Sequence, residues 1–185
     1  MKLGYVTVQG KGRIDLLLAE VVERLEARGM ALAGTVQTNI ERHDRPRCDM
    51  DLRLLPDGPV VRISVDRGAE ARGCRLDAGA LEQSTLWVAG ALAKAELLVV
   101  NKFGKQEAEG KGLAGCMAHA LERGLPVLVG VNGLNLPAFL EFTDGMAQQL
   151  PPDAARVADW CLAAVAETAL PEIRRDTRMA GLPSA

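Results

Sequence analysis

Aromatic residues are scarce in this sequence, and their scarcity argues against one class of function at the outset. Phe, Trp and Tyr together make up 3% of the 185 residues, too few for the stacking platforms that bind single-stranded nucleic acids. An excess of one charge is also missing, because 22 basic and 24 acidic residues leave a net charge of −2. We therefore expect neither nucleic acid nor an anionic membrane surface as a partner.

Cysteines are few and widely spaced, which argues against a metal site. None of the four belongs to a CxxC pair of the kind that binds zinc: Cys48, Cys74, Cys116 and Cys161. We expect reduced thiols in the core of a cytoplasmic protein. No segment approaches the roughly 18 apolar residues of a membrane span, and the N-terminus lacks the pattern of a signal peptide.

The apolar residues that are present predict a single α/β domain. A hydrophobic fraction of 48% in a chain of this length fits one domain over residues 1–170, followed by a tail at 171–185. Apolar runs predict strands at Leu3–Val8, Ala31–Val36, Leu97–Val100 and Pro126–Val131. Segments whose apolar residues recur at helical spacing lie between these strands, and Asp15 is the expected cap of the first helix. The alternation predicts a three-layer fold around a mostly parallel sheet.

An edge hairpin is the expected exception to the parallel order. Asp49–Leu55 and Val60–Val65 both alternate apolar with polar residues, and Pro56-Asp57-Gly58 between them is a turn signal. Further helices are expected at Ala80–Ala93, Leu113–Arg123, Leu136–Phe142 and Asp153–Ala169.

Polar, glycine-containing loops follow three of the predicted parallel strands. Since such loops open on the same edge of a sheet, they predict a ligand crevice there. The first loop carries Gly10, Lys11, Gly12 and Arg13. Glycine amides at the start of a helix favour a phosphate or oxyanion, and a plain turn is the alternative. The loop lacks the spacing and the hydroxyl of a P-loop, because Ile14 and Asp15 stand where Ser or Thr is needed.

The second loop, over residues 101–112, supplies the largest group of candidates. Its ligand-binding candidates are Asn101, Lys102, Gly104 and Lys105, and its catalytic candidates are Glu107 and Glu109. Lysines beside bare glycines favour an anionic ligand, although the same charges also suit a solvated helix start. Four more candidates lie elsewhere: Gln37 at the end of the second strand, Arg75 and Asp77 as a pair that could hold an oxyanion, and Asn132. Asp77 as a helix cap and Asn132 as a turn former are the alternatives.

The run Leu97-Leu98-Val99-Val100-Asn101-Lys102-Phe103-Gly104-Lys105-Gln106-Glu107 resembles a segment of P-loop nucleoside triphosphatases of the thermophilic nucleotide-phosphatase type. In that family an Asp holds magnesium and a Glu activates water. Asn101 and Lys102 stand at those two positions here, whereas Gly104 and Glu107 are retained. The resemblance implies the fold, and the two replacements count against hydrolysis.

A closer resemblance covers about residues 36–152. The runs Gly73-Cys74-Arg75-Leu76-Asp77 and Asn101-Lys102-Phe103-Gly104-Lys105 are similar to an uncharacterised bacterial family whose members are often encoded beside molybdate-transport genes. This resemblance implies a link to molybdate or molybdenum-cofactor metabolism by gene neighbourhood.

The sequence thus predicts an accessory protein that binds a small anion on a degenerate P-loop-like scaffold. Nucleotide, a phosphate-bearing cofactor and molybdate remain open as ligands, and a homo-oligomer or a molybdate-transport protein as partner. Two alternatives stay open. One is an active nucleotide hydrolase with rearranged catalytic groups, in which Lys11 and Lys105 stabilise phosphate charge and Glu107 or Glu109 acts as base. The other is an adaptor with a vestigial site.

Overall fold

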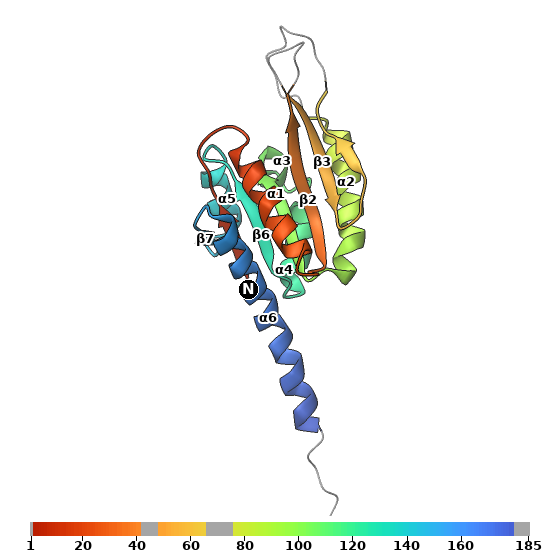
Figure 1. Ribbon diagram of the computed structural model, residues 1–185, viewed down its shortest axis with the longest axis vertical. Helices are drawn as coiled ribbons and strands as arrows, with labels where there is room; N and C mark the ends of the chain where they lie inside the picture. The colour runs from red at the N-terminus through yellow and green to blue at the C-terminus, as the bar shows by residue number, and fades with distance from the viewer. Residues whose placement is uncertain (1, 42–47, 66–75, 180–185) are drawn as a thin grey trace, which may run out of the picture.

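A seven-stranded sheet forms the centre of the protein in a computed structural model (Figure 1), which describes residues 2–41, 48–65 and 76–179 and the side chains as far as residue 168. The strand order is β4-β3-β2-β5-β6-β1-β7. The strands are β1 Leu3–Val6, β2 Leu32–Ile40, β3 Asp49–Leu55, β4 Val60–Arg62, β5 Leu97–Phe103, β6 Val127–Val131 and β7 Gln148–Leu150. All neighbours from β2 to β7 in this order pair in parallel, and β3 and β4 form the antiparallel hairpin at one edge. The predicted fold class is confirmed.

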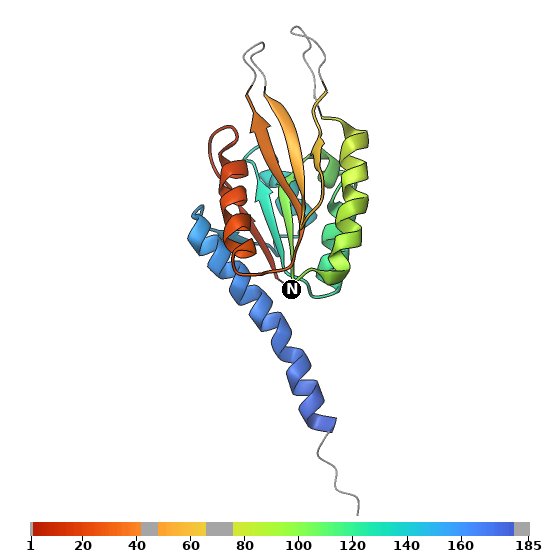
Figure 2. The ribbon, with the colours of Figure 1, turned by 45° about the vertical axis from the view of Figure 1, so that its right-hand side comes forward.

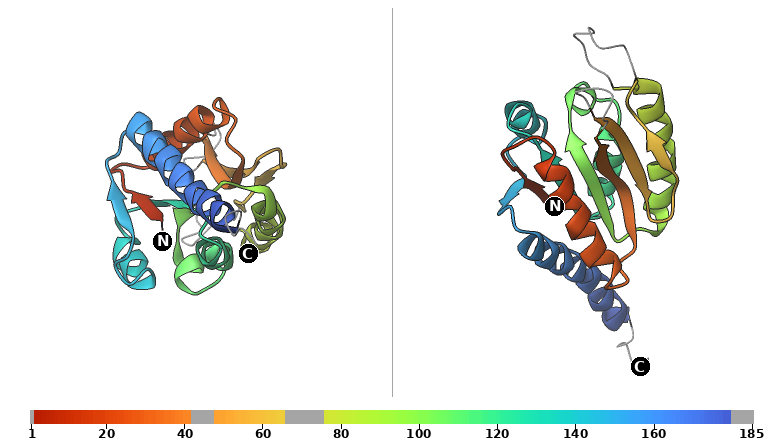
Figure 3. Two further views of the ribbon diagram at one scale, coloured as in Figure 1. Left: turned by 90° about the horizontal axis from the view of Figure 1, so that it is seen from below. Right: turned by 45° about the horizontal axis from the view of Figure 1, so that its top comes forward.

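Helices cover both faces of the sheet. Helix α1 Arg13–Glu26 and helix α6 Ala154–Met179 lie side by side on one face (Figure 3, right). The other face carries α2 Ala78–Ala91 with its 3-10 turn Leu92–Lys94, α4 Ala114–Glu122 and α5 Leu136–Phe142. A single short helical turn, α3 Lys105–Ala108, connects β5 to α4. Figure 2 shows α1 and α2 on opposite sides of the strands.

The apolar run of β5 explains the layering. Leu97 and Val99 pack with α1 and α6, whereas Leu98 and Val100 pack with α2 and α4. All four side chains are fully buried, and each contributes about 1.5–3 kcal/mol to the hydrophobic stabilisation of the fold. A strand covered on both faces is expected to be continuously apolar, as this one is. The predicted adjacency of the strands at Leu3–Val8, Leu97–Val100 and Pro126–Val131 is confirmed, because β5, β6 and β1 are parallel neighbours in the order β5-β6-β1.

Several predicted boundaries are wrong, and two of them change the site. Strand β2 continues to Ile40 instead of ending at Val36, because its polar end pairs with β3. Strand β5 continues to Phe103, so that Asn101 and Lys102 lie within the strand and not in the loop after it. Two other strands are shorter than predicted, since β1 ends at Val6 and β4 at Arg62.

The first helix also begins differently from the prediction. Its N-cap is Gly12, which has no capping side chain, and Asp15 is the third residue of the helix, not its cap. By contrast, Asp153 does cap α6, because its carboxylate accepts a hydrogen bond from the Arg156 N–H at 2.9 Å.

Helix α6 is longer than the face it covers. Its 26 residues span about 39 Å at 1.5 Å per residue, and its C-terminal part projects beyond the body of the domain (Figures 1 and 2). Its first half packs against the core through Val157, Cys161 and Ala164. Among the described residues, none of the helices combines the length and the apolar run needed to cross a membrane.

Candidate functional site

A buried carboxylate at the start of α1 gathers four polar side chains from β2 and β5. Asp15 is 2% exposed. Its Oδ1 accepts a hydrogen bond from Asn101 Nδ2 at 2.8 Å, and its Oδ2 accepts from Asn39 Nδ2 at 2.5 Å and from Lys102 Nζ at 2.9 Å. Gln37 completes the group by donating from Nε2 to Asn39 Oδ1 at 2.8 Å. We call these five residues the Asp15 cluster.

The sequence folds this way because of a bulge in β5. The register is Val100 with Val129 and then Phe103 with Val131, so three steps along β5 face two along β6. In a regular strand, neighbouring side chains point to opposite faces. The extra residue breaks that alternation, which lets Asn101 and Lys102 both reach Asp15. Bulges that redirect a side chain are frequent beside functional sites.

Gly130 on β6 makes room for this bulge. A Cβ at this position would collide with the main-chain oxygen of Asn101 and lie 2.7 Å from a methyl group of Leu18. The close approach of the two strands thus requires glycine here. Gly130 also lies against α1, because Leu18 belongs to that helix.

The loop between β1 and α1 lies next to the Asp15 cluster. Gly10 and Gly12 have φ values of 103° and 73°, a conformation that favours glycine. A Cβ at Gly12 would lie 3.3 Å from Asn39 Nδ2 and 4.0 Å from Asp15 Oδ2. Lys11 and Arg13 are exposed, and neither makes an ion pair with any residue that the structure describes. The positive end of a 14-residue helix adds to these charges.

A cavity of about 560 Å³ opens beside the same loop. It lies among the loop after β1, the loop after β6 and the end of β7, which are neighbouring strands. Its lining residues are Thr7, Val8, Gln9, Gly10, Asn132, Gly133, Gln149 and Pro152. The predicted convergence of the first and third loops on one edge of the sheet is therefore present, with Gly10 and Asn132 on the cavity wall.

Glu107, a catalytic candidate, is tied into its own loop. One carboxylate oxygen accepts from the Gly104 N–H at 3.0 Å and the other from the Leu113 N–H at 3.2 Å. The side chain is 4% exposed, and burial raises its pKa above the ordinary value of 4.5, against the lowering effect of these hydrogen bonds. Gly112 gives it room, because a Cβ there would collide with the carboxylate. The observed role of Glu107 is to close the loop over residues 104–113.

The remaining candidates are more dispersed. The Lys105 side chain is 85% exposed and pairs with Glu109 at 3.6 Å, and Lys111 pairs with Glu109 at 3.3 Å. Asp77 caps α2 by accepting from the Ala80 N–H at 3.0 Å, as the alternative interpretation has it. Asn132 accepts from the Asn135 N–H at 2.9 Å and so also acts as a turn former. Arg75 lies outside the described residues. The ligand-binding roles of these residues stay predictions.

The sequence interpretation missed two members of the site. The sequence predicts Asp15 as a helix cap, whereas its place at the centre of the cluster depends on where β2 and β5 end. Asn39 lies beyond the predicted end of the second strand, although its two-residue spacing from Gln37 is the signal of one face of a strand. The described residues contain no group of three or more His, Cys, Asp or Glu side chains that could hold a metal ion.

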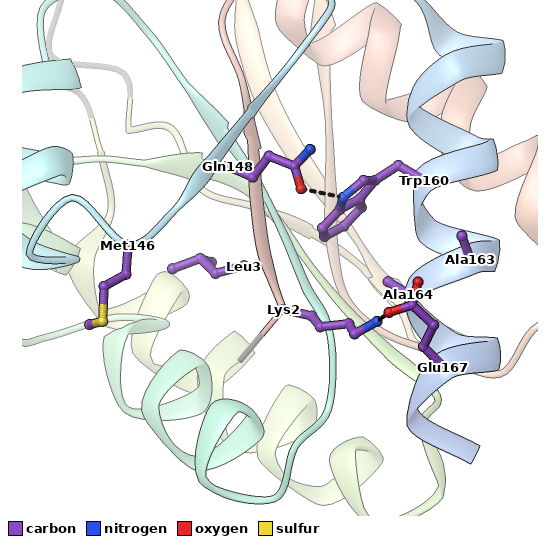
Figure 4. Close-up of a pocket in the computed structure, with 8 residues that line it drawn as sticks. All are labelled: Lys2, Leu3, Met146, Gln148, Trp160, Ala163, Ala164 and Glu167. Atoms are coloured by element: carbon purple, nitrogen blue, oxygen red, sulfur yellow. Dashed lines mark hydrogen bonds and ion pairs between the residues drawn. The ribbon is translucent and has the colours of Figure 1, made fainter. Parts of the chain in front are cut away.

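A second cavity lies between β7, the start of β1 and α6 (Figure 4). Its volume is about 430 Å³. The lining residues are Lys2, Leu3, Met146, Gln148, Trp160, Ala163, Ala164 and Glu167. Trp160 donates from Nε1 to Gln148 Oε1 at 2.9 Å, and Lys2 pairs with Glu167. This cavity is separate from the predicted site, because Leu3 and Gln148 begin their strands, whereas the predicted residues lie where strands end.

Comparison with known proteins finds a relative by sequence and a solved structure with a similar fold. The chain is 34% identical over 148 residues to "Molybdenum import ATP-binding protein ModC 2" of Bradyrhizobium diazoefficiens, a match over 80% of this chain and 16% of that protein. The chain thus spans about a sixth of that relative's length.

A solved structure shares the fold. It is the solution structure of a human cancer-related nucleoside triphosphatase, with a TM-score of 0.53 and 19% identity, covering 81% of this chain and 88% of that chain. Residues 3–160 match a family model, so the chain belongs to the family described as "Protein of unknown function (DUF2478)".

Proposed function

We propose that this protein binds a small phosphate-bearing or oxyanionic ligand at the loop between β1 and α1, as an accessory protein and not as a magnesium-dependent hydrolase. The observation that carries the proposal is the ion pair of Asp15 with Lys102 at 2.9 Å directly beside the glycine loop. An unpaired carboxylate at this place would repel an anion. The ammonium of Lys102 removes that repulsion, and the loop keeps its open amides and the charges of Lys11 and Arg13.

The geometry of the loop supports an anion as ligand. Main-chain N–H groups at the start of a helix, together with the helix dipole, form a favourable environment for phosphate. The adjoining cavity of about 560 Å³ is large enough for a nucleoside or a similar group attached to that phosphate. Gln9, Asn132 and Gln149 on the cavity wall offer amide donors and acceptors.

The end of β5 supports binding without hydrolysis. Magnesium is held by carboxylates and phosphate oxygens, and a general base must be able to accept a proton. Asn101 supplies an amide in place of a carboxylate, and Lys102 supplies a cation in place of a base. The retained acid, Glu107, uses both oxygens on main-chain N–H groups of its own loop.

The relative named as a molybdenum import ATP-binding protein makes molybdate one of the ligands to test. For the same reason we propose a protein of molybdate transport as the partner. We propose the cytoplasm as the place where the two proteins meet. The nucleoside triphosphatase structure supports the scaffold only.

A thermal-shift screen followed by calorimetry tests the proposal. The screen contains ATP, ADP, GTP, phosphate, sulfate, molybdate and tungstate. A ligand present at 100 times its Kd should stabilise the protein by about 2.7 kcal/mol. Lys11→Ala and Arg13→Ala should each weaken binding about tenfold or more, because each removes a charge-assisted contact.

Two further variants sharpen the screen. Lys94→Ala is the matched control, since Lys94 is an exposed lysine in the turn before β5, away from the strand ends. Lys105→Ala tests whether the ligand reaches the predicted second wall. No stabilisation by any anion, or equal binding by the wild type and Lys11→Ala, would contradict the proposal.

Hydrolysis is measured with ATP and GTP in the presence of magnesium. We expect turnover far below the ~1–10³ s⁻¹ usual for enzymes. Turnover within that range that is lost in Glu107→Ala, with the fold of the variant intact, would favour the rearranged hydrolase instead.

A further inference from the structure

Lys102 holds a positive charge at a fixed place beside the glycine loop. Its side chain is 31% exposed, whereas that of Asp15 is 2% exposed. Nζ lies 2.9 Å from Asp15 Oδ2. An ammonium group has three N–H donors, and Asp15 is its one partner among the residues that the structure describes. Two donors therefore remain for another acceptor on the open side.

The carboxylate of Asp15 has little capacity left for a metal ion. Oδ1 accepts from Asn101, and Oδ2 accepts from Asn39 and Lys102. Magnesium requires near-octahedral oxygen ligands at about 2.0–2.1 Å and is usually bound through carboxylates. Three donor groups surround this carboxylate, so a divalent cation would have to displace them and lie against an ammonium. The residues present do not fit magnesium.

A second observation indicates a polar occupant at the same place. Asn101 is 1% exposed, and its Oδ1 has no hydrogen-bond partner among the described residues. Its Nδ2 donates to Asp15, which fixes the amide beside the cluster. A buried polar atom without a partner costs about 1–3 kcal/mol, and such sites are typically completed by water or ligand.

We infer that Lys102 takes the electrostatic role of a metal ion, so that this site binds its anion without any divalent cation. The inference rests on the proposed function, which it deepens by naming the ligand class as a metal-free oxyanion or terminal phosphate. The anion lies on the amides around Gly12, next to the Asp15–Lys102 pair, and accepts a hydrogen bond from Lys102 Nζ. Asp15 orients the ammonium, and the bulge in β5 keeps it in reach.

Calorimetric titration with ADP and, separately, with molybdate tests the inference, each in excess EDTA and in excess MgCl₂. For the ligand that binds, the wild type should show affinities within about threefold of each other in the two buffers. Lys102→Met should lose about tenfold or more in EDTA, because it loses a charge-assisted hydrogen bond. Lys102→Arg, which keeps a cation, should lose much less.

The double variant Asp15→Asn/Lys102→Met guards against a folding defect, because it removes both charges and leaves no unpaired carboxylate. Its far-UV circular dichroism should match the wild type. Its affinity in EDTA should still fall below that of the wild type, because the hydrogen bond from Lys102 is lost, but by less than in Lys102→Met, because no unpaired carboxylate repels the anion. Wild-type binding that requires magnesium would overturn the inference and leave the proposed function standing. Equal binding by the wild type and Lys102→Met in EDTA would also overturn it. The inference would also be overturned if the wild type bound neither ADP nor molybdate in either buffer. The proposed function is tested separately, by the thermal-shift screen with its larger set of anions.

Discussion

At the scale of single residues, the ion pair of Asp15 and Lys102 gives the sharpest prediction of stability. Lys102→Met leaves a carboxylate that is 2% exposed without its cation. We expect a loss of about 2–4 kcal/mol in the free energy of unfolding, somewhat below the ~3–5 kcal/mol of a fully buried pair because Lys102 is partly exposed. Urea denaturation of the wild type, of Lys102→Met and of the double variant is the measurement. Asp15→Asn/Lys102→Met should recover much of the loss, and no recovery would show that packing, not charge, is responsible.

Glu107 predicts a pH dependence of stability. Burial raises its pKa above 4.5 in the folded protein, so the folded state holds this proton to higher pH than the unfolded state does. The contribution of Glu107 to stability is therefore present below about pH 4.5 and is lost as the pH rises through the folded pKa. Urea denaturation across this pH range should show the free energy of unfolding of the wild type falling, relative to that of Glu107→Gln, as the pH increases. A wild type that becomes more stable relative to Glu107→Gln as the pH rises would contradict the prediction.

The residues of the site were predictable in part. Gln37, Asn101 and Lys102 follow apolar strand cores, so their place near the carboxyl edge came from pattern alone. Their common partner, Asp15, did not. An acidic residue in the third position of a helix has the same sequence pattern whether its side chain faces water or a lysine 87 residues away. The order of the strands in the sheet determines whether Asp15 meets water or Lys102.

At the scale of elements, the bulge depends on glycine in the neighbouring strand. Gly130→Ala places a methyl group against the Asn101 carbonyl and Leu18, and we expect it to cost about 1–3 kcal/mol. Gly90→Ala is the matched control, because Gly90 lies in α2 with nothing within 4 Å of the added Cβ. It should be neutral or stabilise by up to about 1 kcal/mol. Chemical denaturation of both variants tests this, and equal effects would argue against the crowding.

Element boundaries were predicted best where local chemistry ends an element. The strand Asp49–Leu55 was predicted correctly, because Pro56-Asp57-Gly58 turns the chain. Strands β2 and β5 run further than predicted, because their polar ends are held by neighbouring strands and by Asp15. Pairing across the sheet thus overrode the polar pattern, and no local signal marks the bulge.

At the scale of the whole molecule, the projecting part of α6 is expected to be dispensable for folding. Among the described side chains, which end at residue 168, this helix contributes Ala154, Val157, Ala158, Cys161 and Ala164 to the buried core. A chain of residues 1–170 should keep its Tm within about 4 °C, a shift that corresponds to roughly 1 kcal/mol for a domain of this size. Thermal unfolding of the two chains is the measurement. A much larger decrease would show that residues 171–185 belong to the domain.

Because of the extra residue in β5, the charge of the site depends on the number of residues in this strand as well as on their identity. Deleting one residue between Val100 and Phe103 would let β5 and β6 pair without interruption, and strict alternation would leave one side chain, not two, on the side of Asp15. The apolar core would keep every residue, yet the site would lose either its amide or its ammonium. Substitution scans hold the number of residues constant and would never sample this change, whereas a single-codon deletion would.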